Sequence, residues 1–83
     1  MKRDREMTQQ TTLNALPIGA SGRVTAVKGN SRITRRILEM GIIPGVHVQL
    51  IKSAPFDDPI EVSVRGYSLA MRRSEAAAIE VAL

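Results

Sequence analysis

With 83 residues, 43% hydrophobic and 24% charged, the chain has the size and composition of one small globular domain. It contains no cysteine, which excludes disulfides, thiolate metal sites and cysteine nucleophiles and is compatible with a reducing compartment. The formal net charge of +4 would attract acidic surfaces or phosphates, but one Phe and one Tyr are too few for a base-stacking platform. We therefore expect a cytoplasmic protein that does not bind nucleic acid.

The beginning of the chain predicts a flexible tail. Basic residues near the start are followed by a polar run over 8–12, which is not the pattern of a signal peptide. Nowhere does the sequence reach the roughly 20 consecutive apolar residues of a transmembrane helix. We expect a tail over 1–11, a folded domain over 12–83, and a role at the membrane only through a partner.

The folded part begins with a short turn and a strand. Leu13 and Leu16 are spaced to share one face of a turn, which Pro17 redirects. After Gly22, residues 23–28 alternate in the manner of a half-buried strand.

One amphipathic helix is predicted over 32–40. Ser31 can cap its N-terminus with the side-chain hydroxyl, and Gly41 can end it because glycine adopts positive φ at low cost. Its apolar positions follow helical spacing and are Ile33, Ile37, Leu38 and Met40.

The second half alternates apolar and polar residues between turn signals. In chain order it predicts a strand over 46–51, a loop over 54–59, a hairpin of strands 60–65 and 67–71, a helical turn over 72–76 and a closing strand over 78–83. Five strands and one short helix after the first strand indicate an all-β, small antiparallel barrel, since closure removes exposed edges. The expected core includes Ile33, Leu38, Val48, Val62, Leu69 and Ile79.

The sequence offers no catalytic constellation. His47 is the only histidine, lies between two valines on a strand and has no nucleophile nearby in sequence. The carboxylates show no pairing in their spacing, and the segment before the helix, Lys28-Gly29-Asn30-Ser31, lacks the glycines of a phosphate-binding loop. We expect no enzymatic activity and no nucleotide binding.

His47 is also the one candidate metal ligand of note. A firm zinc or ferrous site normally needs two or three histidines or cysteines, so a lone strand histidine is more often simply exposed. We expect no required cofactor and at most weak binding of a divalent metal, iron or zinc, at the surface around His47.

The most specific segment spans residues 35–45 and reads RRILEMGIIPG. It resembles the helix-to-strand signature of the FeoA family, in which a leucine-rich helix closes with Met-Gly and the chain turns through Pro-Gly. Further matching blocks follow in order at Ala54-Pro55, Asp58-Pro59-Ile60, 66–72, Glu75-Ala76 and 79–81. The resemblance covers residues 13–83 and departs from the family at Asp57, where glycine is frequent, and at Ile37, where leucine is.

This resemblance implies an SH3-like barrel without catalytic activity that associates with the FeoB-type ferrous-iron transporter of the inner membrane. The cytosolic, GTPase-bearing region of that transporter is the implied contact. The same module resembles the C-terminal SH3-like domain of the DtxR-type metal-dependent repressors. The alternative hypothesis for its function is therefore a metal-responsive regulatory module.

Residues near the helix end and the hairpin are the candidates for a partner surface, because Arg, Tyr and Met are enriched at interfaces. They are Arg35, Arg36, Met40, Ile42, Tyr67, Met71 and Arg72. Taken singly, each arginine is better explained as a solvated surface residue and each methionine as a core filler, so the prediction concerns the group as a patch.

Overall fold

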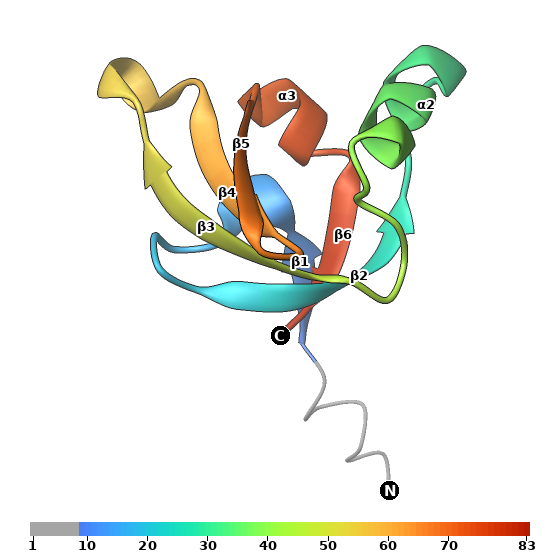
Figure 1. The fold of residues 1–83 in the computed structure, drawn as a ribbon, viewed down its shortest axis with the longest axis horizontal. Helices are drawn as coiled ribbons and strands as arrows, with labels where there is room; N and C mark the ends of the chain where they lie inside the picture. The colour runs from blue at the N-terminus through green and yellow to red at the C-terminus, as the bar shows by residue number, and fades with distance from the viewer. Residues whose placement is uncertain (1–8) are drawn as a thin grey trace, which may run out of the picture.

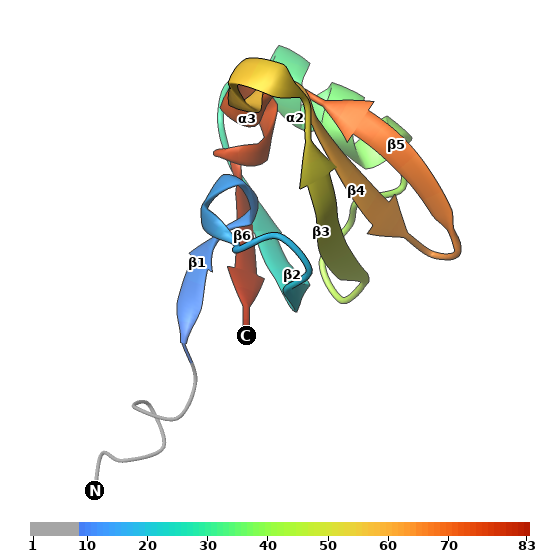
Figure 2. The same ribbon diagram turned by 90° about the vertical axis from the view of Figure 1, so that its left-hand side faces the viewer.

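The computed structural model describes residues 9–83, which form one antiparallel six-stranded sheet with short helical segments. The strands are β1 (Gln10–Thr12), β2 (Ser21–Val27), β3 (His47–Ser53), β4 (Ile60–Val64), β5 (Tyr67–Met71) and β6 (Ile79–Ala82). The helices are α2 (Ser31–Glu39) and α3 (Arg73–Ala76), and 3-10 turns occur at Leu13–Ala15 and Pro55–Asp57. In Figures 1 and 2 the sheet curls around one interior, with α2 and α3 at the end remote from β1 and the C-terminus. The expected all-β, antiparallel architecture is confirmed.

The order of strands in the sheet is β1-β6-β2-β3-β4-β5. The register shifts between Val24 and Ala26 on β2 and between Leu50 and Lys52 on β3. Such irregularities bend a strand and increase its local twist, which lets a short sheet curve around its core. β1 and β5 remain at the two ends of the sheet order, so the curvature leaves both as edge strands.

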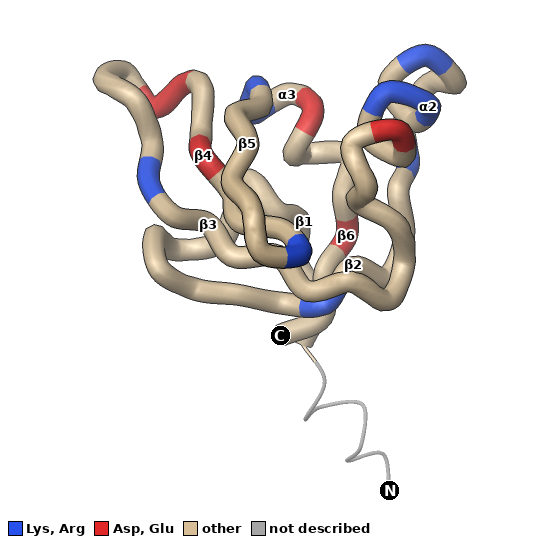
Figure 3. Tube along the Cα trace, in the orientation of Figure 1, with Lys and Arg blue, Asp and Glu red and all other residues tan. Residues whose placement is uncertain are grey.

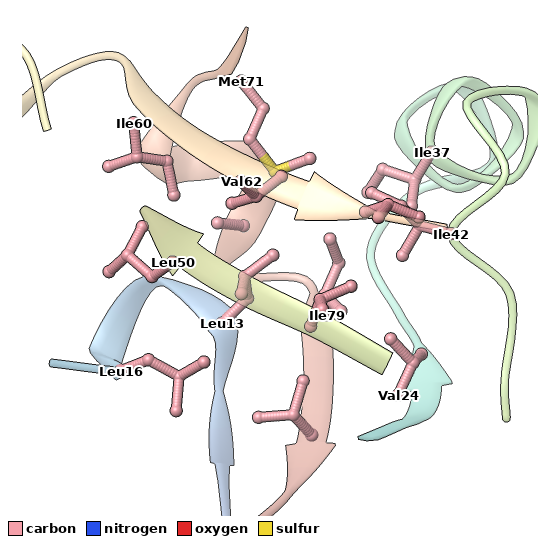
Figure 4. Packing of buried hydrophobic residues seen from close by; sticks show 14 residues of the cluster. Leu13, Leu16, Val24, Ile37, Ile42, Leu50, Ile60, Val62, Met71 and Ile79 are labelled. Carbon is pink, nitrogen blue, oxygen red and sulfur yellow. The ribbon is translucent and has the colours of Figure 1, made fainter. Parts of the chain in front are cut away.

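The core is built from the inward residues of the strands. On β4, Ile60, Val62 and Val64 are all at most 1% exposed, while the residues between them are half-buried, as period-2 alternation requires. Ile79 and Val81 repeat the pattern on β6. Figure 4 shows Ile60, Val62 and Ile79 converging with Leu13 and Leu16 from the first 3-10 turn. Among residues 9–83 no polar or charged side chain is buried, so the core is entirely apolar.

Helix α2 differs from its prediction by one residue. Asn30 is the N-cap, in an extended conformation, and its side chain accepts a hydrogen bond of 2.9 Å from the backbone N–H of Ile33. Ser31, the expected cap, is already helical. Ile37 is fully buried, but Leu38 is 40% exposed and is not a core residue, because one step along a helix turns a side chain by about 100°.

The boundary of the expected tail also differs. Gln10 and Thr11 belong to β1 and pair with Ala82 and Val81 of β6, which makes the strand count six and places α2 after the second strand. Residues 1–8 of the expected tail lie outside the described residues. Over residues 9–83, neither helix has the length and hydropathy needed to cross a membrane.

Candidate partner interface

The end of α2, the start of β5 and helix α3 are held together by two side-chain interactions. The hydroxyl of Tyr67 on β5 donates a hydrogen bond of 2.8 Å to the carbonyl oxygen of Met40, the C-cap of α2. The Nε of Arg36 on α2 lies 3.0 Å from a carboxylate oxygen of Glu75 on α3. Several of the sequence-predicted interface residues are therefore brought to one region of the surface.

Tyr67 is 47% exposed, although its hydroxyl is engaged. Its position depends on Gly41, which has φ of +90°, and a Cβ there would lie 2.9 Å from the Tyr67 hydroxyl oxygen. The glycine therefore both ends α2 and makes room for the tyrosine. Only the first of these roles was visible in the sequence.

Glu75 joins two elements through its two carboxylate oxygens. One oxygen faces Arg36, and the other accepts a 2.9 Å hydrogen bond from the backbone N–H of Arg72, the N-cap residue of α3. The Arg36 side chain is 67% exposed, whereas that of Glu75 is 14% exposed. The carboxylate thus fixes a solvent-facing guanidinium at the junction of α2 and α3.

Two predicted interface residues are not on this surface. Ile42 is 0% exposed and Met71 is 3% exposed, so both fill the core. Met40 is half-buried and packs against the core, so its accessible part is small. The predicted residues that are exposed are Arg35, Arg36, Tyr67 and Arg72, and we call these four residues the arginine–tyrosine surface. In Figure 3 basic residues mark α2 and the segment leading into α3.

One apolar residue near this surface was missed. Leu38 lies on the exposed side of α2 and, with Ser31, Thr34, Arg35 and Glu39, lines an open hollow of about 480 Å³. The helical pattern placed Leu38 in the core because it neighbours Ile37. The spacing of Ile33, Ile37 and Met40 defines one face of the helix, and Leu38 lies about 100° from Ile37 and off that face.

His47 lies apart from the arginine–tyrosine surface, at the start of β3. It is exposed, and its cross-strand partner on β2 is Arg23. A neighbouring guanidinium disfavours a bound cation through charge repulsion. Within residues 9–83 no three His, Asp or Glu side chains gather in a way that could hold a metal ion.

Comparison with known proteins identifies the relatives of the chain. The FeoA domain family matches residues 11–83. A protein of Porphyromonas gingivalis, described as a fusion of Fe(2+) transport protein A with the Fe(2+) transporter FeoB, is 35% identical over 71 residues. That match covers 86% of this chain but only 8% of the fusion protein.

Solved structures agree with the sequence match. A FeoA-like protein from Clostridium acetobutylicum superimposes with a TM-score of 0.81 at 35% identity, covering 90% of this chain and 86% of that one. The zinc complex of Stenotrophomonas maltophilia FeoA, described as a prokaryotic SH3 domain protein, gives a TM-score of 0.72 at 33% identity, covering 83% and 86%. A manganese-dependent transcriptional repressor shares the fold alone, at 21% identity and a TM-score of 0.80 over 87% of this chain and 36% of the repressor. The expected SH3-like fold is confirmed.

Proposed function

The chain belongs to the FeoA family, whose members take part in ferrous-iron transport, and on that premise we propose that it binds and regulates a FeoB-type Fe(II) transporter. The observation that carries this proposal is the Porphyromonas gingivalis fusion, in which a domain related to this chain is covalently joined to FeoB. Fusion converts association into an intramolecular step at a high effective concentration, which is useful where two modules work in contact.

We place the contact on the cytoplasmic side of the transporter, at its GTPase-bearing region. The arginine–tyrosine surface is the face offered to it. Arg35 and Arg72 are exposed, Arg36 is held by Glu75, and Tyr67 is held by Met40, so two of the four side chains are already oriented before binding. Preorganised side chains lose less conformational entropy when a partner binds.

The proposed role is that of an interaction module in the cytoplasm, without enzymatic activity or a required cofactor. The iron is the cargo of the transporter. Regulation would then follow from the module binding one nucleotide state of the GTPase-bearing region more tightly than another, because a ligand shifts an equilibrium only through such a difference in affinity.

Equilibrium binding to full-length FeoB transporter from the same cell, reconstituted in nanodiscs, tests the proposal. The titration is run with GDP, with a GTP analogue and without nucleotide. We expect saturable binding whose Kd depends on the nucleotide, and loss of affinity in Arg35→Glu. Arg23→Glu is the matched control, because it reverses an exposed arginine on β2, outside the surface. Absence of binding in every nucleotide state would refute the proposal.

A metal-responsive regulatory module is the second candidate, and the zinc complex of the Stenotrophomonas maltophilia protein favours it. In this chain the metal ion would bind at His47. Titration with Zn(II) and Fe(II), followed by calorimetry, should then give micromolar or tighter binding that His47→Ala abolishes. Binding that is weaker, or unchanged in His47→Ala, would remove this candidate.

A further inference from the structure

Strand β5 presents an unprotected edge. It pairs with β4 on one side and ends the sheet order on the other. Exposed edges are usually blunted by charged residues or proline, but β5 reads YSLAM and has neither. The opposite end of the sheet, β1, is only three residues long. β5 is thus the longer open edge within residues 9–83.

The register shows which backbone groups of β5 face outward. A two-residue turn joins β4 to β5, and Val64 and Tyr67 form the closing pair. Such a closing pair exchanges backbone hydrogen bonds, and opposed residues then alternate between bonded and non-bonded pairs. Ser68 and Ala70 therefore direct their N–H and C=O groups away from β4. Both residues are exposed, so these groups are accessible to an added strand.

Ala70 contributes to the lining of two hollows. One, of about 340 Å³, is lined by the end of β3, the β3–β4 loop and the start of β4, including Lys52, Pro55 and Ile60. The other, of about 210 Å³, lies beside Met71 and Arg72. Successive side chains of a β-strand point to opposite faces, so alternate side chains of an added strand would lie over opposite faces of the sheet beside Ala70.

The positive charges at the two ends of β5 favour an acidic segment as its pairing partner. Arg65 lies at the tip of the β4–β5 turn and Arg72 follows the other end of β5, and residues 65–72 contain no acidic side chain. Antiparallel pairing of two copies about Leu69 would bring Arg65 of one copy toward Arg72 of the other, which like-charge repulsion opposes. An extended segment carrying carboxylates near both ends would instead complement the two arginines.

We infer that the β5 edge accepts an acidic, extended segment of the partner as an added strand. Its main-chain groups would pair with those of Ser68 and Ala70, and its carboxylates would face Arg65 and Arg72. This inference rests on the proposed function, because the segment is assigned to the FeoB-type transporter. It deepens that proposal by giving the mode of contact, in which main-chain hydrogen bonds provide affinity and alternate side chains provide specificity.

The decisive variant is Ala70→Pro, measured against full-length FeoB transporter in nanodiscs. Proline removes the outward N–H and blocks strand addition, yet it is tolerated on an edge strand whose N–H faces solvent. We expect a loss of affinity of about tenfold or more, since one hydrogen bond is removed and its neighbours are prevented from forming. Ala70→Val is the matched control, because it keeps the N–H and favours strand structure. Circular dichroism and thermal unfolding establish that both variants fold.

A second pair of variants tests the charge assignment independently of folding at Ala70. Arg65→Glu/Arg72→Glu should weaken binding and invert its salt dependence, whereas Arg23→Glu/Arg32→Glu, with the same change in net charge, should not. Wild-type binding that neither Ala70→Pro nor the Arg65/Arg72 reversal weakens would overturn the inference while leaving the proposed function intact. No binding by the wild type would overturn both. Wild-type dimerisation in sedimentation experiments that Ala70→Pro abolishes would assign the edge to a second copy and overturn the acidic-segment assignment.

Discussion

The hydroxyl of Tyr67 donates its hydrogen bond to the backbone carbonyl of Met40, 2.8 Å away, and so ties the β4–β5 hairpin to the last turn of α2. The carbonyl belongs to the C-terminal end of the helix, where acceptors lack intrahelical partners. One side chain therefore both satisfies a helix end and fixes the position of the edge strand.

Replacing Tyr67 with Phe removes this bond and little else. We expect the free energy of unfolding to fall by about 0.5–1.5 kcal/mol, the usual net worth of one hydrogen bond. Urea denaturation followed by circular dichroism measures it. Ser68→Ala, an exposed change one residue away, is the control and should leave stability unchanged. Equal midpoints for wild type and Tyr67→Phe would show that the bond contributes nothing.

Gly41→Ala should destabilise the protein more than Gly45→Ala. Both glycines have positive φ, +90° and +102°, so alanine carries a similar backbone cost of about 1–2 kcal/mol at each. Only at position 41 would the added Cβ also approach the Tyr67 hydroxyl, at 2.9 Å, because nothing lies within 4 Å of it at position 45. A double-mutant cycle isolates this contact. In a Tyr67→Phe background the difference between the two alanine variants should shrink, and a difference that persists would contradict the assigned clash.

Ile37→Ala and Leu38→Ala should behave very differently despite being neighbours. Ile37 is 0% exposed, and its truncation should cost about 2–5 kcal/mol through lost burial and a residual cavity. Leu38 is 40% exposed, so Leu38→Ala should cost well under half as much. Thermal unfolding of the two variants tests which of them faces the core. Similar losses in both would mean that α2 is rotated relative to the structure described above.

Glu75 makes two contacts that substitutions can separate. Glu75→Gln keeps an acceptor for the N–H of Arg72 but removes the charge opposite Arg36. We expect it to cost at most about 1 kcal/mol, since Arg36 is largely exposed and the pair is screened by solvent. Glu75→Ala also loses the acceptor at the start of α3 and should cost about 0.5–2 kcal/mol. Denaturation of both variants at low and high salt measures which of them loses more free energy of unfolding. A Gln variant as unstable as the Ala variant would reverse the assigned roles.

Much of the fold could be predicted because its strands obey simple alternation. The strand over 67–71 was placed on its observed bounds, and Val48, Val62 and Ile79 proved to be core residues. Strand β1 was missed because its three polar and weakly apolar residues become a strand only by pairing with β6, a contact that local sequence does not encode. The helix start was off by one because Asn and Ser are both good N-caps and stand next to each other here.

The candidate site was harder to predict than the fold. Apolar residues at the end of a helix can serve a core or an interface, and burial placed Ile42 and Met71 in the core. Asp57 stands where glycine is frequent in the FeoA family, and the backbone explains that preference. Phe56 and Asp57 have φ of 69° and 67°, a conformation that glycine adopts more easily. The open edge of β5 follows from strand order in space, which alternation along the chain does not reveal.

The pairing of β1 with β6 determines how this domain can be attached to another protein. The backbone N–H of Leu83 donates to the carbonyl of Gln9 at 2.8 Å, so both described ends leave the domain side by side, opposite α2 and α3 (Figure 1). A linker at either end would therefore emerge from one point. A linker at this position lies on the opposite side of the domain from α2 and α3. Joining the domain to a larger chain there would leave the face with Arg35 and Arg36 accessible.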